Sequence, residues 1–171
     1  MLDGHLENLK RYGSDKDLYL WWDCYDGPVK RKAMVILEGD YREMHFVIVA
    51  HHSGNPNAYI EVKPWDSVCY DEEGHKHSDE WMAGTLFSVH RGSTYYGDAY
   101  WDQSDNRLYI GWDYGHGEDL QVGRDNRVVN DGYKWRIAEI LMDVAGANYE
   151  LEMANAYDSD YSKREREMNR V

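Results

Sequence analysis

The segment EMHFVIVAHH, at residues 43–52, constrains the fold more than any other part of the chain. Its centre is apolar and β-branched and shows no helical period, which predicts a buried β-strand. The turn sequence SGNP follows at 53–56, and residues 57–65 then alternate between two faces. One face of this second segment carries Ala58, Ile60 and Val62, and the other carries Tyr59, Glu61 and Lys63. The two segments therefore predict two successive strands of a sheet.

Further strand-like segments lie on both sides of this pair. Residues 17–27 are rich in aromatic side chains and end at a Gly-Pro turn, and residues 29–39 resemble their hairpin partner. Residues 84–92 and 106–115 predict two more strands. The segment between those two predicts a short strand or a wide turn.

Two segments predict helices. Residues 5–13 predict a short helix that Gly13 ends, and residues 132–157 predict a long one. The long helix has the three-four spacing of a buried stripe, made of Trp135, Ala138, Leu141 or Met142, and Ala145. Six or so strands followed by one long helix predict an α+β fold, in which the helix packs on one face of an antiparallel sheet of about six strands.

A chain of 171 residues suits one domain. We assign residues 1–157 to a single α+β domain, within which 66–82 and 117–132 are long loops. Residues 158–171 form a mixed-charge tail that can continue as an exposed helix.

The charge of the chain is strongly negative and uneven. The formal net charge is −13, from 19 basic and 32 acidic residues. Residues 162–171 hold four basic and two acidic side chains, so the remaining chain has 15 basic and 30 acidic residues, a net charge of −15. A body this acidic repels phosphate backbones, so direct, sequence-independent binding of free nucleic acid is not expected. The same field attracts basic proteins, although acidity also serves solubility alone.

One loop concentrates acidic residues. The sequence YDEEGHKHSDEW at 70–81 carries Asp71, Glu72, Glu73, Asp79 and Glu80. A solvated loop needs no further purpose, but such a loop can also mimic nucleic-acid phosphates toward an arginine-rich groove. We therefore treat these five residues as a candidate partner-binding set.

Two histidines end strand-like segments and raise the possibility of catalysis. His90 ends TLFSVH, and His116 lies in the turn of YIGWDYGHGED. If the two strands pair, His90 and Asp113 reach the same edge of the sheet with His116 just beyond. Two histidines can divide proton abstraction and donation near neutral pH, with Asp113 as the orienting carboxylate. Such a set suits RNA phosphodiester cleavage, which needs no metal.

Two other interpretations of these residues stay open. His90, Asp113, His116 and Asp119 also supply enough nitrogen and oxygen ligands for zinc or manganese. Rival ligand pairs occur at His51 and His52 and at His75 and His77. Alternatively, the histidines and aspartates only satisfy the hydrogen bonds of turns and strand ends. No phosphate-cradling glycine loop or zinc-finger spacing is present, so no organic cofactor is expected and a divalent metal is the open alternative.

The sequences VHRGSTYYG and LYIGWDYGHGED resemble a loosely defined group of small phage and prophage proteins. That group carries an H-G-G-x-T-Y stretch, then I-G-F-D-C-A-H, then a helix that opens with an aromatic residue. The first stretch is matched by His90, Gly92, Thr94 and Tyr95, and the second by Ile110, Gly111, Asp113 and His116.

The resemblance covers roughly residues 51–146 and departs from the group's pattern at five positions. These are Arg91 and Ser93, near the expected glycine pair, Trp112, where the group has phenylalanine, and Tyr114 and Gly115, where the group has Cys-Ala. The resemblance implies a mobile-element origin and supplies no reaction. Among short acidic proteins of mobile elements, it implies a counter-defence inhibitor, including an anti-CRISPR protein.

These observations lead to two predicted functions. The first is a counter-defence protein whose acidic surface binds and inhibits a basic nucleic-acid-handling host protein, such as a CRISPR-Cas nuclease. The alternative is a small histidine-dependent hydrolase or ribonuclease that acts on RNA presented by a partner. No apolar run reaches membrane-spanning length, and the first residues lack a signal peptide's apolar stretch, so we predict a cytoplasmic protein of the host cell with no membrane partner.

Overall fold

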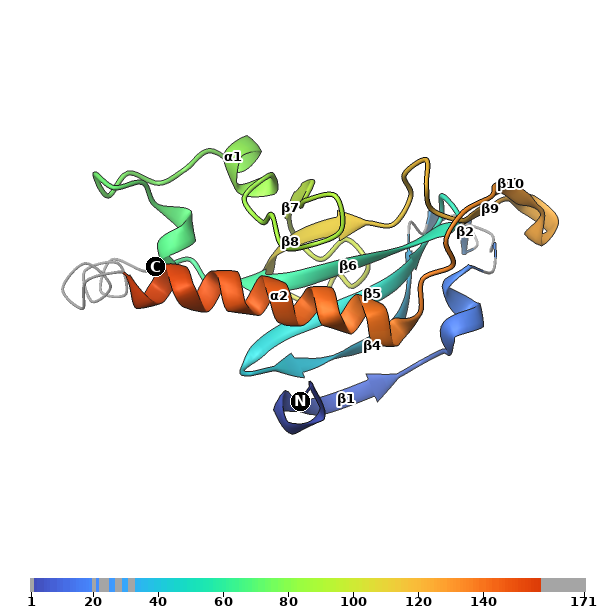
Figure 1. Cartoon of the computed structure of the whole chain (residues 1–171), viewed down its shortest axis with the longest axis horizontal. Helices are drawn as coiled ribbons and strands as arrows, with labels where there is room; N and C mark the ends of the chain where they lie inside the picture. The colour runs from blue at the N-terminus through green and yellow to red at the C-terminus, as the bar shows by residue number, and fades with distance from the viewer. Residues whose placement is uncertain (1, 20, 22–24, 27–28, 31–32, 158–171) are drawn as a thin grey trace.

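The computed structural model describes residues 2–19, 21, 25–26, 29–30 and 33–157. Its main element is a six-stranded antiparallel sheet with the strand order β1-β4-β5-β6-β8-β7 (Figure 1). In that order the strands are Leu6–Arg11, Ala33–Tyr41, Met44–His51, Asn55–Val62, Leu108–Asp113 and Tyr95–Gly97. The helices are α1 (Asp79–Ala83) and α2 (Ile137–Ala156). The predicted α+β class, with about six antiparallel strands and a long helix, is confirmed.

Short elements fill the connections. Two small ladders pair β2 (Tyr25–Asp26) with β3 (Val29–Lys30), and β9 (Gln121–Val122) with β10 (Val128–Asn130). Single 3-10 turns occur at Leu2–His5, Asp15–Leu18, Ser67–Cys69 and Arg124–Asn126. Among the described residues, no helix is both long and apolar enough to cross a bilayer.

The strands with the clearest periodicity lie where the sequence predicts them. The apolar segment at 43–52 forms β5, and the alternating segment after it forms β6. The two pair antiparallel, with Ile48 opposite Ala58, across a turn that contains Gly54. Strand β8 then pairs with the other edge of β6. This places β6 in the interior of the sheet.

Helix α2 covers one face of the sheet (Figure 1). Its buried side chains are Ile137, Ile140, Val144, Ala147, Asn148 and Leu151. On the sheet side the core includes Phe46, Ile48, Ile60, Ile110 and Trp112, all at most 1% exposed. Full burial of each large apolar side chain contributes about 1.5–3 kcal/mol, so this layer dominates the stability of the fold.

The predicted buried stripe of this helix is only partly right. Leu141 and Ala145 pack against the core, and so does Trp135, which precedes the helix, but Ala138 and Met142 are exposed. The helix begins at Ile137, whose N–H donates to the carboxylate of Asp15 over 2.8 Å. The residue before it, Arg136, is extended, with φ −112° and ψ 158°. The buried stripe is therefore displaced from the predicted one.

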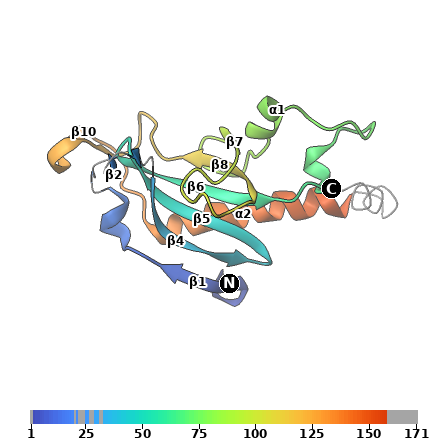
Figure 2. The ribbon, with the colours of Figure 1, turned by 180° about the vertical axis from the view of Figure 1, so that it is seen from behind.

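The opposite face of the sheet has its own core. Its buried members include Val47, Val49, Tyr59 and Tyr109. The connection between β7 and β8 lies across this face and contributes Ala99, Tyr100 and Trp101 (Figure 2). Both faces of the central strands are thus covered.

The predicted helix at 5–13 is wrong. After one 3-10 turn, this segment forms the edge strand β1, which pairs with β4. The ladder is irregular between Glu7 and Lys10, where Asn8 has a φ of 54°. Pairing with β4 satisfies backbone groups that a short, isolated helix would leave to water.

The predicted strand at 84–92 is also wrong. Residues 86–93 form a closed loop, in which the N–H of Ser93 donates to the carbonyl of Leu86 and the Leu86 N–H donates to the Ser93 hydroxyl. Arg91 and Gly92 have φ values of 60° and 80°. These positive values are incompatible with a β-strand. Instead, β8 pairs with β7, the short strand predicted between the two segments.

The predicted hairpin around residues 27–28 is confirmed only as the two-residue ladder of β2 and β3. Residues 15–18 form a 3-10 turn rather than the start of a strand, and the segment at 29–39 enters the main sheet only from Ala33. The rest of the aromatic segment at 17–27 and the tail at 158–171 lie outside the described residues.

Candidate functional site

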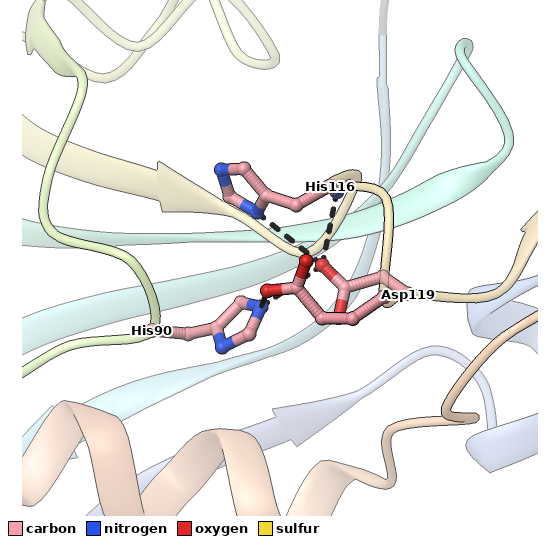
Figure 3. A group of neighbouring side chains, drawn as sticks. His90, His116 and Asp119 are labelled. Carbon is pink, nitrogen blue, oxygen red and sulfur yellow. Dashed lines mark hydrogen bonds and ion pairs between the residues drawn. The ribbon is translucent and has the colours of Figure 1, made fainter.

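The two histidines that the sequence singles out meet at the end of β8. His116 and Asp119 lie in the turn that follows this strand, and His90 comes from the closed loop at 86–93 (Figure 3). A bridge between Asp119 and Tyr133 brings the segment before α2 alongside the turn. Three separate parts of the chain therefore build one cluster.

Asp119 is the centre of this cluster. Its side chain is fully buried, and its Oδ2 atom lies 2.9 Å from His90 Nε2 and 3.3 Å from His116 Nδ1 (Figure 3). The backbone N–H of His116 donates to the same oxygen over 3.0 Å. The indole N–H of Trp135 donates to the other oxygen, Oδ1, over 2.8 Å.

The Asp119 carboxylate is charged at neutral pH. Burial alone raises the pKa of a carboxyl group, but the hydrogen bonds from Trp135, the His116 N–H and His90 outweigh burial here. The pKa of Asp119 therefore lies below its usual value. A buried, ionised carboxylate between two imidazoles attracts a proton or a metal cation.

Aromatic packing fixes the ring of His90. The ring stacks parallel to Tyr114, with the ring centroids 5.1 Å apart and the planes at 1°, and it also contacts Trp135. Its backbone N–H donates to Asp143 of α2, which also accepts from the Tyr114 hydroxyl. Burial raises the pKa of Asp143, although these hydrogen bonds partly oppose the increase. The His90 nitrogen is therefore held in one position.

The donor atoms fit a coordination shell. One ligand atom from each of His90, His116, Glu118 and Asp119 lies within 4.8 Å of the others. Ligand atoms about 2.0–2.2 Å from a tetrahedral metal lie about 3.3–3.6 Å apart. The 3.3 Å from Asp119 Oδ2 to His116 Nδ1 matches this spacing, whereas the 2.9 Å to His90 Nε2 is a hydrogen-bond distance that metal binding would have to widen. Glu118 Oε1 lies 3.8 Å from His90 Nε2, and this half-exposed side chain can close the difference by rotation.

Asp113 lies outside this group of ligand atoms. Its Oδ1 lies 3.7 Å from His116 Nε2, the nitrogen on the far side of the ring, and accepts the N–H of Gly115 over 3.0 Å. Of the four residues that the sequence proposes as metal ligands, the structure brings three together, His90, His116 and Asp119; it places Asp113 further away and adds Glu118. The position of Glu118 beside Asp119 in the turn was the available signal.

The two rival histidine pairs do not form such a cluster in the described part of the chain. His75 is exposed and lies near Asp71 and Glu73, and His77 stacks on Trp81. His51 and His52 pack against each other, with ring centroids 4.4 Å apart.

The geometry favours a metal site over an acid–base pair of histidines. In such a pair, each imidazole presents a nitrogen to the substrate from its own side. Here one nitrogen of each ring converges on the same oxygen of a buried aspartate. The donor set of two imidazoles and two carboxylates suits zinc or manganese.

No protein-family model matches the chain. Comparisons with curated proteins and with solved structures find no match either. The resemblance to small phage proteins therefore stays a prediction, and the function has to be argued from the site.

The acidic loop is a second feature of interest. All five predicted partner-binding residues are exposed: Asp71, Glu72, Glu73, Asp79 and Glu80. In the described part of the chain, none of the five forms an ion pair with a lysine or arginine. The chain before α1 extends away from the sheet, whereas α1 itself lies beside β7 and buries Met82 in the core (Figure 1).

Proposed function

We propose that this protein is a metal-dependent hydrolase of phosphoesters whose centre is formed by His90, His116, Glu118 and Asp119. The observation that supports this function is the convergence of both imidazoles on the ionised Asp119. Three of these ligands on a tetrahedral zinc, or all four on a five- or six-coordinate manganese, would leave one position for a water, whose lowered pKa would supply a nucleophile at neutral pH.

The surrounding residues have separate roles in this proposal. Trp135 holds Asp119 through its indole N–H, as outer partners of metal ligands do. Arg91 lies at the rim, with its Nε 3.4 Å from Glu118 Oε1, and its exposed guanidinium can bind an anionic phosphoryl group. Hydrolysis adds water at phosphorus, breaks the ester P–O bond and returns a proton to the leaving oxygen.

We expect purified protein, stripped with EDTA, to bind one Zn²⁺ or Mn²⁺ per chain in isothermal titration calorimetry. His116→Gln removes one ligand nitrogen and is expected to weaken binding at least about 10-fold. His75→Gln in the exposed loop is the matched control and is expected to change nothing, because His75 lies outside the cluster.

Hydrolysis of bis(p-nitrophenyl) phosphate by the metal-loaded protein tests the reaction class. Equal weakening of metal binding by His116→Gln and His75→Gln would contradict the centre itself. If the protein binds metal but hydrolyses neither this ester nor a panel of phosphomonoesters, the proposed metal centre stands and the proposed phosphoesterase activity is overturned.

The exposed acidic loop favours a second function. We propose that the loop binds a basic nucleic-acid-handling host protein, such as a CRISPR-Cas nuclease, and so counters host defence. The support is the exposure of its five carboxylates, none of which pairs with a lysine or arginine among the described residues, on a chain of net charge −13. A projecting anionic loop can occupy a groove that otherwise holds phosphates.

This second function predicts binding that depends on salt and on the loop. The triple change Glu72→Gln, Glu73→Gln and Glu80→Gln is expected to weaken binding to a CRISPR-Cas nuclease at least about 10-fold at low salt. The matched control changes three exposed acids elsewhere: Glu7→Gln, Glu43→Gln and Asp125→Asn. Biolayer interferometry at rising salt measures both. Affinity that is insensitive to salt, or equally reduced by the control, would contradict this function.

A further inference from the structure

A polar cavity lies on the face of the sheet opposite α2. Its volume is about 590 Å³, which is the size of a small-ligand site. A smaller cavity of about 280 Å³ adjoins it and shares His51, Asn57 and Asp113. The residues that the argument needs from the larger cavity are Asn57, Tyr59, Thr94, Asp98, Tyr100 and Asp113.

An unusual ladder of polar side chains leads to this cavity. Ser53, Asn55, Asn57 and Tyr59 alternate along β6 and the turn before it. Asn55 and Asn57 are at most 9% exposed, and Tyr59 is 2% exposed. An interior strand covered on both faces normally carries apolar side chains, so two buried asparagines there need a reason.

The ladder is hydrogen-bonded from end to end. The Ser53 hydroxyl donates to Asn55 over 2.7 Å, and the Asn55 amide donates to Asn57 over 2.9 Å. The Asn57 amide then donates to the Tyr59 hydroxyl over 3.1 Å, and Tyr59 bonds Tyr100. All of these donors point the same way along the strand, and such chains strengthen their last donor.

Tyr100 ends the chain at the cavity. When it accepts the proton of Tyr59, its own hydroxyl proton is available to a ligand in the cavity. Burial raises the pKa of Tyr100, so the hydroxyl keeps its proton at neutral pH. With Tyr59 as the donor, the cavity offers a polarised phenol proton to a ligand that carries an acceptor; with Tyr100 as the donor, its oxygen accepts from the ligand instead.

The rest of the lining offers acceptors and ring faces. Asp98 and Asp113 contribute carboxylates, and Thr94 contributes a hydroxyl. Tyr59, Tyr95 and Tyr100 form an aromatic wall, with ring centroids 5.3–5.7 Å apart. Among the described residues that line the cavity, none is a lysine or arginine. The basic groups at the cavity are imidazoles: His51 and His52 line it, and His116 lies 3.7 Å from Asp113. Two carboxylates with no lysine or arginine among the described lining residues disfavour an anionic ligand.

From this arrangement we infer that the cavity binds a neutral polyhydroxylated ligand, that is, a sugar. Each hydroxyl of a sugar is both donor and acceptor, as a lining of carboxylates and a terminal phenol requires. The apolar face of a sugar ring packs on tyrosine rings. Apart from Asp113, none of the cavity residues named above lies near the metal cluster, so this inference does not depend on the proposed hydrolase.

Saturation-transfer difference NMR in the presence of EDTA tests the inference. The probes are glucose, galactose, mannose, ribose, maltose and cellobiose, with tetramethylammonium and guanidinium as cationic competitors. We expect at least one sugar to bind, and Tyr100→Phe to weaken its Kd about 5- to 10-fold, since one hydrogen bond is lost. Tyr157→Phe, at the exposed end of α2, is the control and is expected to have no effect.

Asp98→Asn separates a sugar from a cation. The amide still accepts and donates hydrogen bonds, so sugar binding is expected to change less than about 3-fold, whereas loss of the charge would weaken a cation at least about 10-fold. Thermal unfolding verifies that each variant folds, and Thr94→Val replaces Tyr100→Phe if that variant does not. The inference is overturned if no sugar binds, if only the cations bind, or if the folded Tyr100→Phe or Thr94→Val variant binds as the parent does.

Discussion

Gly54→Ala is expected to lower the free energy of unfolding by about 3 kcal/mol or more, because the new methyl group would clash with the backbone of Val122. Gly54 has a φ of +88°, in the region that side chains disfavour. A Cβ atom there would lie 1.7 Å from the carbonyl oxygen of Val122. The Gly54 N–H donates to the carbonyl of His51, and the Val122 N–H donates to the carbonyl of Gly54. The turn is therefore held on both sides and cannot move away.

Gly74→Ala is the matched control for this prediction. Gly74 has nearly the same φ, +86°, but no atom lies within 4 Å of its added Cβ. The control isolates the backbone penalty, which is about 1 kcal/mol. Chemical denaturation of both variants measures the difference. Equal costs at the two positions would show that the contact between the turn and β9 does not form.

The strands of the sheet interior could be predicted because their sequence pattern has only one interpretation. In β5 and β6, β-branched residues and strict alternation exclude a helix, and the turn at 53–56 separates the two strands. The edge strand β1 could not be predicted, because the seven residues HLENLKR are equally compatible with about two turns of helix. Its partner β4, which is distant in sequence, decides the structure.

The buried face of α2 shows a different limit. Apolar residues occur on several sides of this helix, including Ala138, Leu141 and Met142 beside the buried Ile140 and Val144. Periodicity alone cannot rank two such faces. The first residue of α2, Ile137, donates its N–H to Asp15, which lies more than a hundred residues away in the sequence. This contact fixes where the helix begins.

The candidate site was predicted through a pairing that does not exist. We expected His90 to reach His116 along a strand paired with β8, but a closed loop and the segment before α2 bring them together. Trp135 was expected in the helix and instead holds Asp119. The polar ladder was visible as alternating Ser53, Asn55, Asn57 and Tyr59, and only the structure shows that it is buried.

Asp119→Asn is expected to lower the free energy of unfolding by about 3 kcal/mol and to weaken Zn²⁺ binding at least about 100-fold. The new amide keeps the shape of the side chain and can still accept from Trp135 through its oxygen. Its NH₂ group then replaces Oδ2, where the backbone N–H of His116 donates. The imidazoles can change tautomer to accept from the amide, but a backbone N–H cannot, so one buried donor loses its partner.

Asp113→Asn is the matched control, because it makes the same chemical change at the end of β8, close to the cluster but outside it. Asp113 is partly exposed, and an amide oxygen can still accept the N–H of Gly115. We expect a loss below about 1 kcal/mol and little change in metal affinity. Chemical denaturation without metal and calorimetry with Zn²⁺ separate the two roles of Asp119. If Asp119→Asn lost stability but bound zinc normally, the cluster would be a structural hydrogen-bond network. If it lost neither, the convergence on Asp119 would not describe the protein in solution.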